Sequence, residues 1–288
     1  MYVDYLRCDA AAQSCDTSLA LQCFSTRAEI NPSKLNNRPK AEDLEGMDGN
    51  LERANWKHRT ELIIGADGVA RLSGSSVAVV GLGGVGSACA EALARAGVGK
   101  VILVDGDGGS ETNINRQIIA FTDNIGRPKA EVMAERVRRI NPECEVVPEA
   151  CWIERSNVGD LLHLGLDYLA DAIDSIDAKL DLIEACLKSG TRIVSSMGAG
   201  NRLDPTMFRI ADISKTRMCP MARSVRQRLR KRGIESGLTV VFSEEPPVVR
   251  SDGPIGSIST TPPAAGLAMA SVIVRQLALG DGTWEGWC

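Results

Sequence analysis

The stretch GLGGVGSACAEALARAGVGKVILVDGD, residues 81–107, decides the fold. Gly81, Gly83 and Gly86 form a G-x-G-x-x-G pattern between an apolar segment and a helical one. Glycines at this spacing let the backbone approach phosphates, whose charge is met by amide N–H groups and the helix N-terminus. Asp105 ends the next predicted strand and can accept hydrogen bonds from ribose hydroxyls. The stretch predicts a nucleotide-binding βαβ unit, and NAD and ATP fit it equally well.

The same alternation of short apolar strands and helices continues along the chain. The predicted strands are residues 76–81, 100–105, 144–149, 166–173 and 191–197, and the predicted helices are residues 86–97, 128–140 and 178–190. Near-continuous apolar strands separated by helices are typical of a parallel sheet covered on both faces. We therefore predict an α/β protein with a doubly wound, mostly parallel sheet and a Rossmann-like nucleotide site.

The pattern changes near both ends of the chain. Residues 1–50 lack sustained periodicity, and we expect a disordered or variable extension before a single domain at 51–288. After residue 200 we predict a C-terminal elaboration of four segments. These are a strand at 208–213, a basic helix at about 215–232, a crossing loop at about 243–262 and an apolar helix at about 263–279.

Composition narrows the class of protein. A hydrophobic content of 44% and a charged content of 24% are those of a soluble globular protein. No apolar run approaches the roughly 20 residues that span a bilayer, and Arg275 interrupts the last helix, so we expect it to pack in the core. The nine cysteines include no C-x-x-C pair, which disfavours structural zinc, and the N-terminus lacks a secretory signal. We therefore expect a cytoplasmic protein with free thiols.

The segment beyond the second strand distinguishes the two nucleotides. Asn113, Arg116 and Lys129 supply an amide and two cations there. A nicotinamide site has little use for converging cations, whereas a triphosphate undergoing cleavage needs them to stabilise developing charge. Asp174 follows the fourth predicted strand and could hold Mg²⁺ on the phosphates, or it could cap the next helix. Together these residues favour ATP over NAD.

Four motifs in this region carry a specific resemblance. The sequences GLGGVGS, VDGD–TNINRQ, GRPKAE and DAIDS resemble the ThiF/MoeB/HesA family, the prokaryotic relatives of ubiquitin-activating enzymes. Its members adenylate a carboxylate with ATP and Mg²⁺. Within the family, residues 56–280 look most like the branch that acts on threonylcarbamoyladenosine in tRNA. The resemblance therefore implies an ATP-dependent dehydration that cyclises this nucleoside through an acyl-adenylate.

The resemblance also implies roles for individual residues. Asp105 would bind ribose, Asp174 would bind or position Mg²⁺, and Arg116 and Lys129 would stabilise transition-state charge. Arg59 matches an arginine that reaches the partner protomer's ATP site, which implies a homodimer. The residues that would contact the phosphates are Gly81, Gly83, Gly84, Gly86, Asn113, Arg116 and Lys129.

The basic helix is the candidate RNA-binding surface. No acidic residue occurs from Ile213 through Ile234, although the whole chain has a net charge of −4. We expect an apolar stripe on one side of the helix, formed by Met218, Met221, Val225 and Leu229. The cations then face solvent, where they can contact a phosphate backbone. The candidate RNA-binding residues are Arg223, Arg226, Arg230 and Lys231.

The sequence departs from the family pattern at two points. The paired C-x-x-C zinc motifs of the sulfur-carrier activators are absent, in agreement with the tRNA branch. Val240 stands where that branch often has a cysteine, so no thiol-dependent step can use this position.

Three alternatives to the tRNA dehydration stay open. They are activation of a ubiquitin-like sulfur carrier's C-terminal glycine, a nonenzymatic nucleotide-binding module and an NAD-dependent oxidoreductase. A sulfur-transfer protein is a further possible partner that the resemblance implies.

Overall fold

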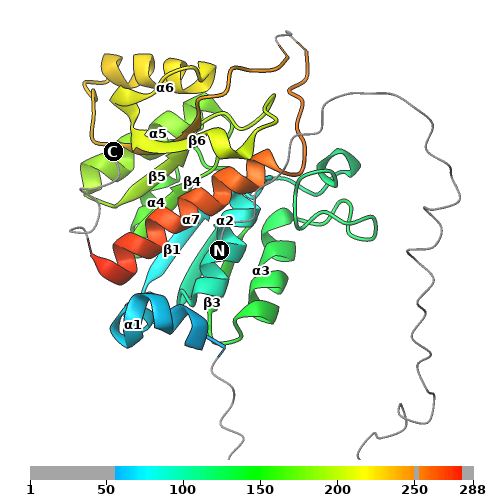
Figure 1. Ribbon diagram of the computed structural model, residues 1–288, viewed down its shortest axis with the longest axis vertical. Helices are drawn as coiled ribbons and strands as arrows, with labels where there is room; N and C mark the ends of the chain where they lie inside the picture. Colours follow the sequence, from blue (N-terminus) through cyan, green and yellow to red (C-terminus); the bar gives the residue numbers. More distant parts are fainter. Residues whose placement is uncertain (1–55, 250–252, 281–288) are drawn as a thin grey trace, which may run out of the picture. The chain divides into compact units, whose positions relative to one another are not determined.

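A seven-stranded sheet organises the protein, and the computed structural model describes residues 56–249 and 253–280. The strand order is β3-β2-β1-β4-β5-β7-β6, with every neighbouring pair parallel except β6 and β7 (Figure 1). The strands are β1 (Ser76–Val80), β2 (Lys100–Val104), β3 (Glu145–Glu149), β4 (Tyr168–Asp171), β5 (Ile193–Ser196), β6 (Phe208–Asp212) and β7 (Thr239–Ser243). The predicted doubly wound, mostly parallel sheet is confirmed, whereas the predicted extension at 1–50 lies outside the described residues.

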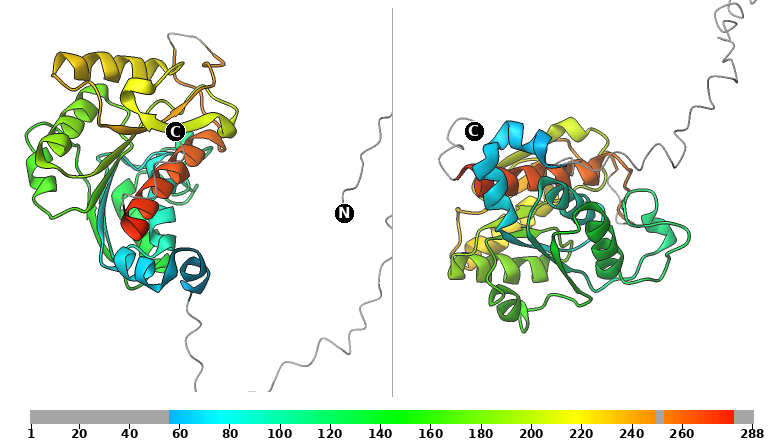
Figure 2. Two further views of the ribbon diagram at one scale, coloured as in Figure 1. Left: turned by 60° about the vertical axis from the view of Figure 1, so that its left-hand side comes forward. Right: turned by 90° about the horizontal axis from the view of Figure 1, so that it is seen from below.

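Helices cover both faces of the sheet (Figure 2). One layer holds α1 (His58–Ser73), α2 (Gly86–Ala96), α3 (Lys129–Ile140) and α7 (Thr261–Leu279), and the other holds α4 (Val158–Leu162), α5 (Ile176–Ser189) and α6 (Pro220–Lys231). Short 3₁₀ turns are η3 (Glu111–Asn113), η4 (Pro205–Met207) and η5 (Ile213–Lys215). Gly65 interrupts α1 with a φ of 74° and ψ of 166°.

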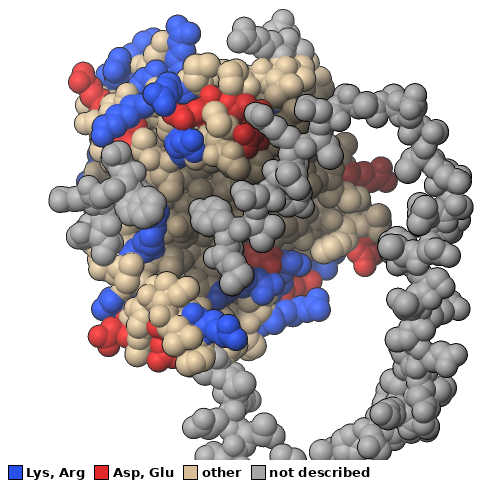
Figure 3. Space-filling model, in the orientation of Figure 1, with Lys and Arg blue, Asp and Glu red and all other residues tan. Residues whose placement is uncertain are grey.

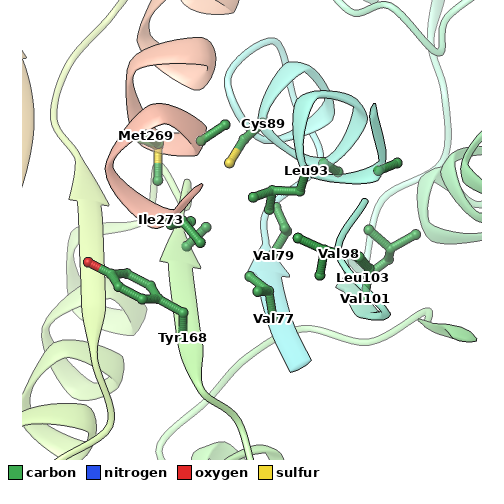
Figure 4. Packing of buried hydrophobic residues seen from close by; sticks show 14 of the residues in the cluster. Val77, Val79, Cys89, Leu93, Val98, Val101, Leu103, Tyr168, Met269 and Ile273 are labelled. Carbon is green, nitrogen blue, oxygen red and sulfur yellow. The ribbon is translucent and has the colours of Figure 1, made fainter. Parts of the chain in front are cut away.

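Side-chain alternation along β1 builds two hydrophobic cores. Val77 and Val79 face the layer with α2 and α7, whereas Ala78 and Val80 face the opposite layer. Figure 4 shows Met269 and Ile273 of α7 in the first core, together with Cys89 of α2 and Val79 of β1. Because both faces are buried, the strand is a continuous apolar run rather than an alternating one.

The strand order creates a crevice between β1 and β4. From β1 the chain proceeds outward to β2 and β3, then returns to β4 and proceeds outward in the other direction. Ligands bind at such a switch point, beyond the carboxyl ends of the strands. The backbone N–H of Gly81 donates to Val104 and that of Ala172 donates to Val80, both at 2.8 Å, so the loops leave the sheet side by side.

The C-terminal part differs from the prediction in two respects. The run TVVFS forms β7, which lies between β5 and β6 in the sheet and was not predicted as a strand. The basic helix begins at Pro220, and Met218 precedes it with a φ of 59° and an exposed side chain. The predicted place of Met218 in the apolar stripe is therefore wrong; Ala222, Val225 and Leu229 form the buried side of α6.

Helix α7 packs against the sheet, as predicted. It is the one helix among residues 56–249 and 253–280 that is long and apolar enough to cross a membrane, by length and composition alone. Half of that apolar window is buried in the protein, and Gly266 lies tightly against α2, because a Cβ there would be 2.1 Å from the Val85 carbonyl oxygen. Its apolar character is explained by this packing between α1, α2 and the sheet.

Candidate active site

A cavity of about 710 Å³ lies at the carboxyl ends of the strands. Its walls come from the loops after β1, β2, β3, β4 and β5, together with Pro262 at the start of α7. This volume is within the roughly 300–1,000 Å³ of small-molecule sites. Most of the predicted nucleotide-binding residues line it, namely Gly81, Gly83, Gly84, Asp105, Asn113, Arg116, Lys129 and Asp174.

The glycines of the first loop permit close packing. Gly81 has a φ of 87°, and a Cβ there would lie 2.8 Å from the Ala172 carbonyl oxygen. A Cβ on Gly84 would lie 2.9 Å from Pro262. At Gly86 a Cβ would be 1.7 Å from the Gly81 carbonyl oxygen, and Gly86 is not among the lining residues. Gly86 thus serves the close contact between loop and helix, and its predicted contact with the phosphates stays a prediction.

Asp105 connects this loop to the next one. Its two carboxylate oxygens accept hydrogen bonds from the backbone N–H groups of Leu82, at 2.6 Å, and Asp107, at 2.8 Å. The side chain is 8% exposed and borders the cavity. Each oxygen retains a further lone pair, so the carboxylate can hold the loops and still accept a hydroxyl proton.

Lys129 is the first residue of α3 and is nearly buried. Its Nζ lies 2.7 Å from Oδ2 of Asp107, and its backbone N–H donates to the carbonyl oxygen of the same aspartate. Asn113 is also buried and accepts a hydrogen bond from the Ser110 N–H. Asp107 was not among the predicted site residues, although the VDGD motif contains it.

Arg116 and its neighbour Gln117 form another wall. The Arg116 guanidinium donates to the Thr112 carbonyl oxygen at 2.7 Å and to the Asn115 side chain at 2.9 Å. Gln117 is 6% exposed, and its buried Oε1 has no hydrogen-bond partner within the described part of the chain. A buried amide oxygen of this kind is costly unless a donor reaches it. Gln117 is thus a site residue that sequence reasoning missed beside the more conspicuous arginine.

Asp174 lies in the loop between β4 and α5. Its side chain is exposed to the cavity, and the residue at the N-cap of α5 is Ser175. The alternative of a capping role for Asp174 is therefore wrong. Asp174 borders the cavity, as predicted, and its contact with Mg²⁺ stays a prediction.

A buried ion pair lies beneath this loop and was not predicted. Lys179 and Asp171 are both 0% exposed, with Nζ 2.9 Å from Oδ2. Lys179 also donates to the carbonyl oxygen of Ser196 at 3.0 Å, and Ser195 Oγ donates to Asp171 at 2.6 Å. Asp171 Oδ1 accepts from the Ile173 N–H. The network joins the ends of β4 and β5 and fixes the loop that carries Asp174.

Arg59 does not contribute to this cavity. It is exposed on α1, which leads into the start of β1 (Figure 1). The cavity lies at the opposite, carboxyl ends of the strands. The same helix exposes Leu62 and Ile63, whose side chains are 70% and 84% accessible. Arg59 could reach such a cavity only in another copy of the chain.

Lys and Arg side chains gather over α6 at the upper left of Figure 3. Arg223, Arg230 and Lys231 are exposed, in agreement with their predicted solvent-facing position. Arg226 is half-buried and donates to the carbonyl oxygen and hydroxyl of Thr216. Its predicted position on the open surface is therefore wrong. Met221, near the start of the same helix, lines the cavity.

The thiols in the described segments are free. Burial raises the pKa of Cys89 and of Cys186 to about 12. Both lie in the cores, as the sequence predicted. Cys151 is exposed at the cavity. Its pKa is raised, mainly by partial burial of the thiol and to a lesser extent by the nearby Glu149 carboxylate. A thiolate is disfavoured at all three positions.

The described side chains around the cavity form no cage for a metal ion. Within residues 56–249 and 253–280, no cluster of three His, Cys, Asp or Glu side chains has metal-binding geometry. Mg²⁺ in nucleotide sites is commonly held by one or two carboxylates together with substrate phosphates. Asp174 is one of the carboxylates that line the cavity.

Curated relatives resemble the chain over most of its length. The tRNA threonylcarbamoyladenosine dehydratase of Bacillus subtilis is 44% identical over 236 residues, which cover 76% of this chain and 93% of that protein. The protein of the same name from Escherichia coli is 40% identical over 217 residues, covering 72% of this chain and 81% of that protein.

Solved structures agree with these sequence relationships. A crystal structure of the Escherichia coli tRNA N6-threonylcarbamoyladenosine dehydratase with AMP superposes with a TM-score of 0.74 at 38% identity, covering 77% of this chain and 94% of that chain. The same enzyme with ATP gives a TM-score of 0.72 at 37% identity, with the same coverage. The sequence profile of the ThiF family matches residues 57–283. The chain therefore belongs to the ThiF family.

Proposed function

We propose that this protein catalyses the ATP-dependent dehydration of threonylcarbamoyladenosine in tRNA. The observation that carries the proposal is the cavity, which combines a glycine loop, the Asp105 carboxylate and the cations Arg116 and Lys129 at the switch point of the sheet. The relatives of that name cover most of the chain at 40% and 44% identity. The remaining steps follow from what each side chain can do.

The cavity fits ATP on structural grounds. The glycine loop leaves its backbone open to phosphates. Asp105 follows the neighbouring strand and borders the same cavity, where it can accept a hydrogen bond from the ribose of a bound nucleotide. Gln117 brings an unpartnered buried oxygen to the same cavity. Arg116 and Lys129 supply the positive charge that a triphosphate requires. We assign the phosphates to Gly81, Gly83, Gly84, Asn113, Arg116 and Lys129.

Asp174 would hold Mg²⁺, which supplies charge neutralisation on the phosphates when it is bound. The exposed carboxylate has no hydrogen-bond or ion-pair partner within the described residues, and the loop beneath it is fixed by the Asp171 network. A free carboxylate on a rigid loop can bind a cation without first breaking another contact.

The reaction begins with the carboxylate of the threonyl group. Its oxygen attacks the α-phosphorus of ATP, forming an acyl-adenylate and releasing pyrophosphate. Arg116 and Lys129 stabilise the negative charge that develops on the phosphoryl oxygens and the leaving group. Intramolecular attack on the activated carbonyl then closes a ring and displaces AMP, so the carboxylate oxygen leaves with AMP. Positioning and electrostatics suffice, and no thiol is required.

The basic surface of α6 is the proposed contact for the tRNA backbone. Arg223, Arg230 and Lys231 lie on a helix whose Met221 reaches the cavity, so a bound RNA would lie beside the reacting centre. Replacement of Arg230 and Lys231 by Glu should weaken tRNA binding and flatten its salt dependence, while ATP affinity is retained. The matched control is Arg138→Glu and Arg139→Glu on α3, outside the cavity lining.

A homodimer would place Arg59 in the partner's ATP site. Arg59 cannot serve the cavity of its own chain, and the exposed Leu62 and Ile63 beside it are suited to an interface. Mixing Arg59→Ala subunits with Arg116→Ala subunits tests this directly. Mixed dimers contain one intact site, so random exchange should restore about a quarter of wild-type activity. No recovery after demonstrated subunit exchange would refute the shared site.

The central experiment follows AMP release and nucleoside mass. Purified protein, ATP and Mg²⁺ are incubated with tRNA bearing threonylcarbamoyladenosine, and in parallel with the same tRNA lacking that group. We expect AMP release and loss of water only with the modified tRNA. Arg116→Ala should reduce the rate by roughly 10²–10³-fold, as removal of a transition-state donor does. Pyrophosphate exchange only with a ubiquitin-like carrier would instead identify a carrier-activating enzyme.

We propose that the protein works in the cytoplasm. The cysteines at 89, 144, 151, 186 and 219 are unpaired, as a reducing cytoplasm would keep them. A sulfur-transfer partner stays an expectation from the resemblance. Activity with purified protein alone in the assay above would make such a partner unnecessary for the dehydration.

A further inference from the structure

Trp152 is an exposed aromatic side chain in the wall of the cavity. It follows β3 by three residues and is 61% exposed. Large exposed indoles on a protein surface are frequently parts of binding sites. Neither the motifs nor the predicted phosphate contacts give this residue a role.

The indole is packed against the backbone of Gly106. A Cβ on Gly106 would lie 2.5, 2.6 and 2.7 Å from the ring carbons Cδ2, Cε2 and Cγ of Trp152. Nearly equal distances to three neighbouring ring atoms place this point over the ring face rather than beyond its edge. Glycine at 106 therefore allows one face of the indole to lie flat on the chain, directly after Asp105.

The loop that carries the indole is held in place. The Asn157 side-chain amide donates to the Trp152 carbonyl oxygen at 2.8 Å, and its oxygen accepts from the Glu154 N–H at 2.9 Å. Ile153 is buried in the core beside them. The indole thus projects from a fixed backbone, with most of its surface open on the cavity side.

The order of the strands places Trp152 where the base of a bound nucleotide would lie. The glycine loop follows β1, Asp105 follows β2 and Trp152 follows β3, and these strands are adjacent in that order. A nucleotide has the same linear order of phosphates, ribose and base. Strands are about 4.8 Å apart, so β3 lies roughly 10 Å from the phosphate loop, within reach of a nucleotide base.

We propose that Trp152 is the stacking platform for the adenine of ATP. One face of the indole rests on Gly106, and the other receives the base while Asp105 holds the ribose. This inference depends on ATP being the ligand, as the proposed function states. Base–aromatic stacking tolerates different bases, so Trp152 contributes affinity, and discrimination among bases comes from other contacts.

The test compares two ligands by titration calorimetry. ATP carries the base, whereas inorganic tripolyphosphate carries the phosphates without ribose or base. Trp152→Ala should weaken ATP binding about tenfold and leave tripolyphosphate binding unchanged, while Trp152→Phe should retain most of the affinity. Trp56→Ala is the matched control, because Trp56 is 44% exposed and outside the cavity lining. ATP should also change indole emission in the wild type, and this change should disappear in Trp152→Phe.

Each alternative outcome overturns the proposal in a recognisable way. Unchanged ATP affinity in Trp152→Ala refutes stacking and leaves the proposed function standing. Equal loss of ATP and tripolyphosphate affinity would mean that the loop, rather than the base contact, was disturbed. Loss of tRNA affinity with intact ATP affinity would assign the indole to RNA. Failure of wild-type protein to bind ATP would remove the proposed function as well.

Discussion

Replacement of Lys179 by methionine tests the buried network beneath the cavity. Its ammonium donates to Asp171, to Ser195 and to the Ser196 carbonyl oxygen, at 2.9, 3.3 and 3.0 Å, with no exposed surface. Methionine fills nearly the same volume, so the cost comes from electrostatics rather than from a cavity. Asp171 would be left as a buried carboxylate with only the Ser195 hydroxyl and the Ile173 N–H as donors.

Breaking one partner of a buried ion pair costs about 3–5 kcal/mol of the free energy of unfolding. For a domain of this size, that loss lowers the melting temperature by roughly 10 °C. The second substitution Asp171→Asn, made in the Lys179→Met background, removes the uncompensated charge. The double variant should therefore be more stable than Lys179→Met alone.

Urea denaturation with a shared slope m measures both changes. Lys188→Met is the control on the same helix, because Lys188 is 72% exposed in its ion pair with Glu184. An exposed pair of this kind contributes about 0–1 kcal/mol. If Lys179→Met costs no more than Lys188→Met, the reasoning about an uncompensated buried carboxylate is refuted. A double variant less stable than either single variant would also contradict it.

Three further predictions concern the cavity and its surroundings. Asp174→Asn should raise the Mg²⁺ concentration required for half-maximal AMP release more than it raises the Kd for ATP measured without metal. In peptide mapping, Cys151 should be alkylated well before the buried Cys89, and bound ATP should protect it. The rate of Cys151 alkylation should still rise with pH beyond 9, because the pKa of this thiol is raised. Arg226→Ala should cost about 1–2 kcal/mol of stability, because Thr216 loses its donor, with little change in tRNA affinity.

Local patterns predicted the first half of the fold well. In β1, α2 and β2 the glycine spacing, the apolar runs and the helix period all agree, and such agreement specifies one structure. Asp105 and Lys129 could be placed at the site because each stands at the end of an element whose boundary is marked in the sequence. The carboxyl edge of a parallel sheet then brings them together.

Tertiary contacts decided what the sequence could not. The run of residues 239–243 is short, and its place between β5 and β6 depends on pairing across a long stretch of chain. Lys179 looked like one of several charged residues on α5, because burial of a lysine depends on a partner from another strand. Arg226 likewise differs from Arg230 only through its contact with Thr216. These distinctions are invisible to composition and periodicity.

The charge balance of the cavity explains why a metal ion belongs in the proposed reaction. Six carboxylates and three cations line it, and two of those carboxylates, Asp177 and Asp181, are already paired with Arg228 of α6 and with Arg232 directly after it. Four carboxylates then remain against three cations, of which Lys129 is paired with Asp107. Arg116 and Lys129 place positive charge locally beside the proposed phosphates, but the lining as a whole has no net positive charge. In the proposed reaction, a divalent ion bound with the nucleotide would reverse this balance, because Asp174 would become a ligand rather than a repulsive charge and the ion would neutralise part of the substrate's charge.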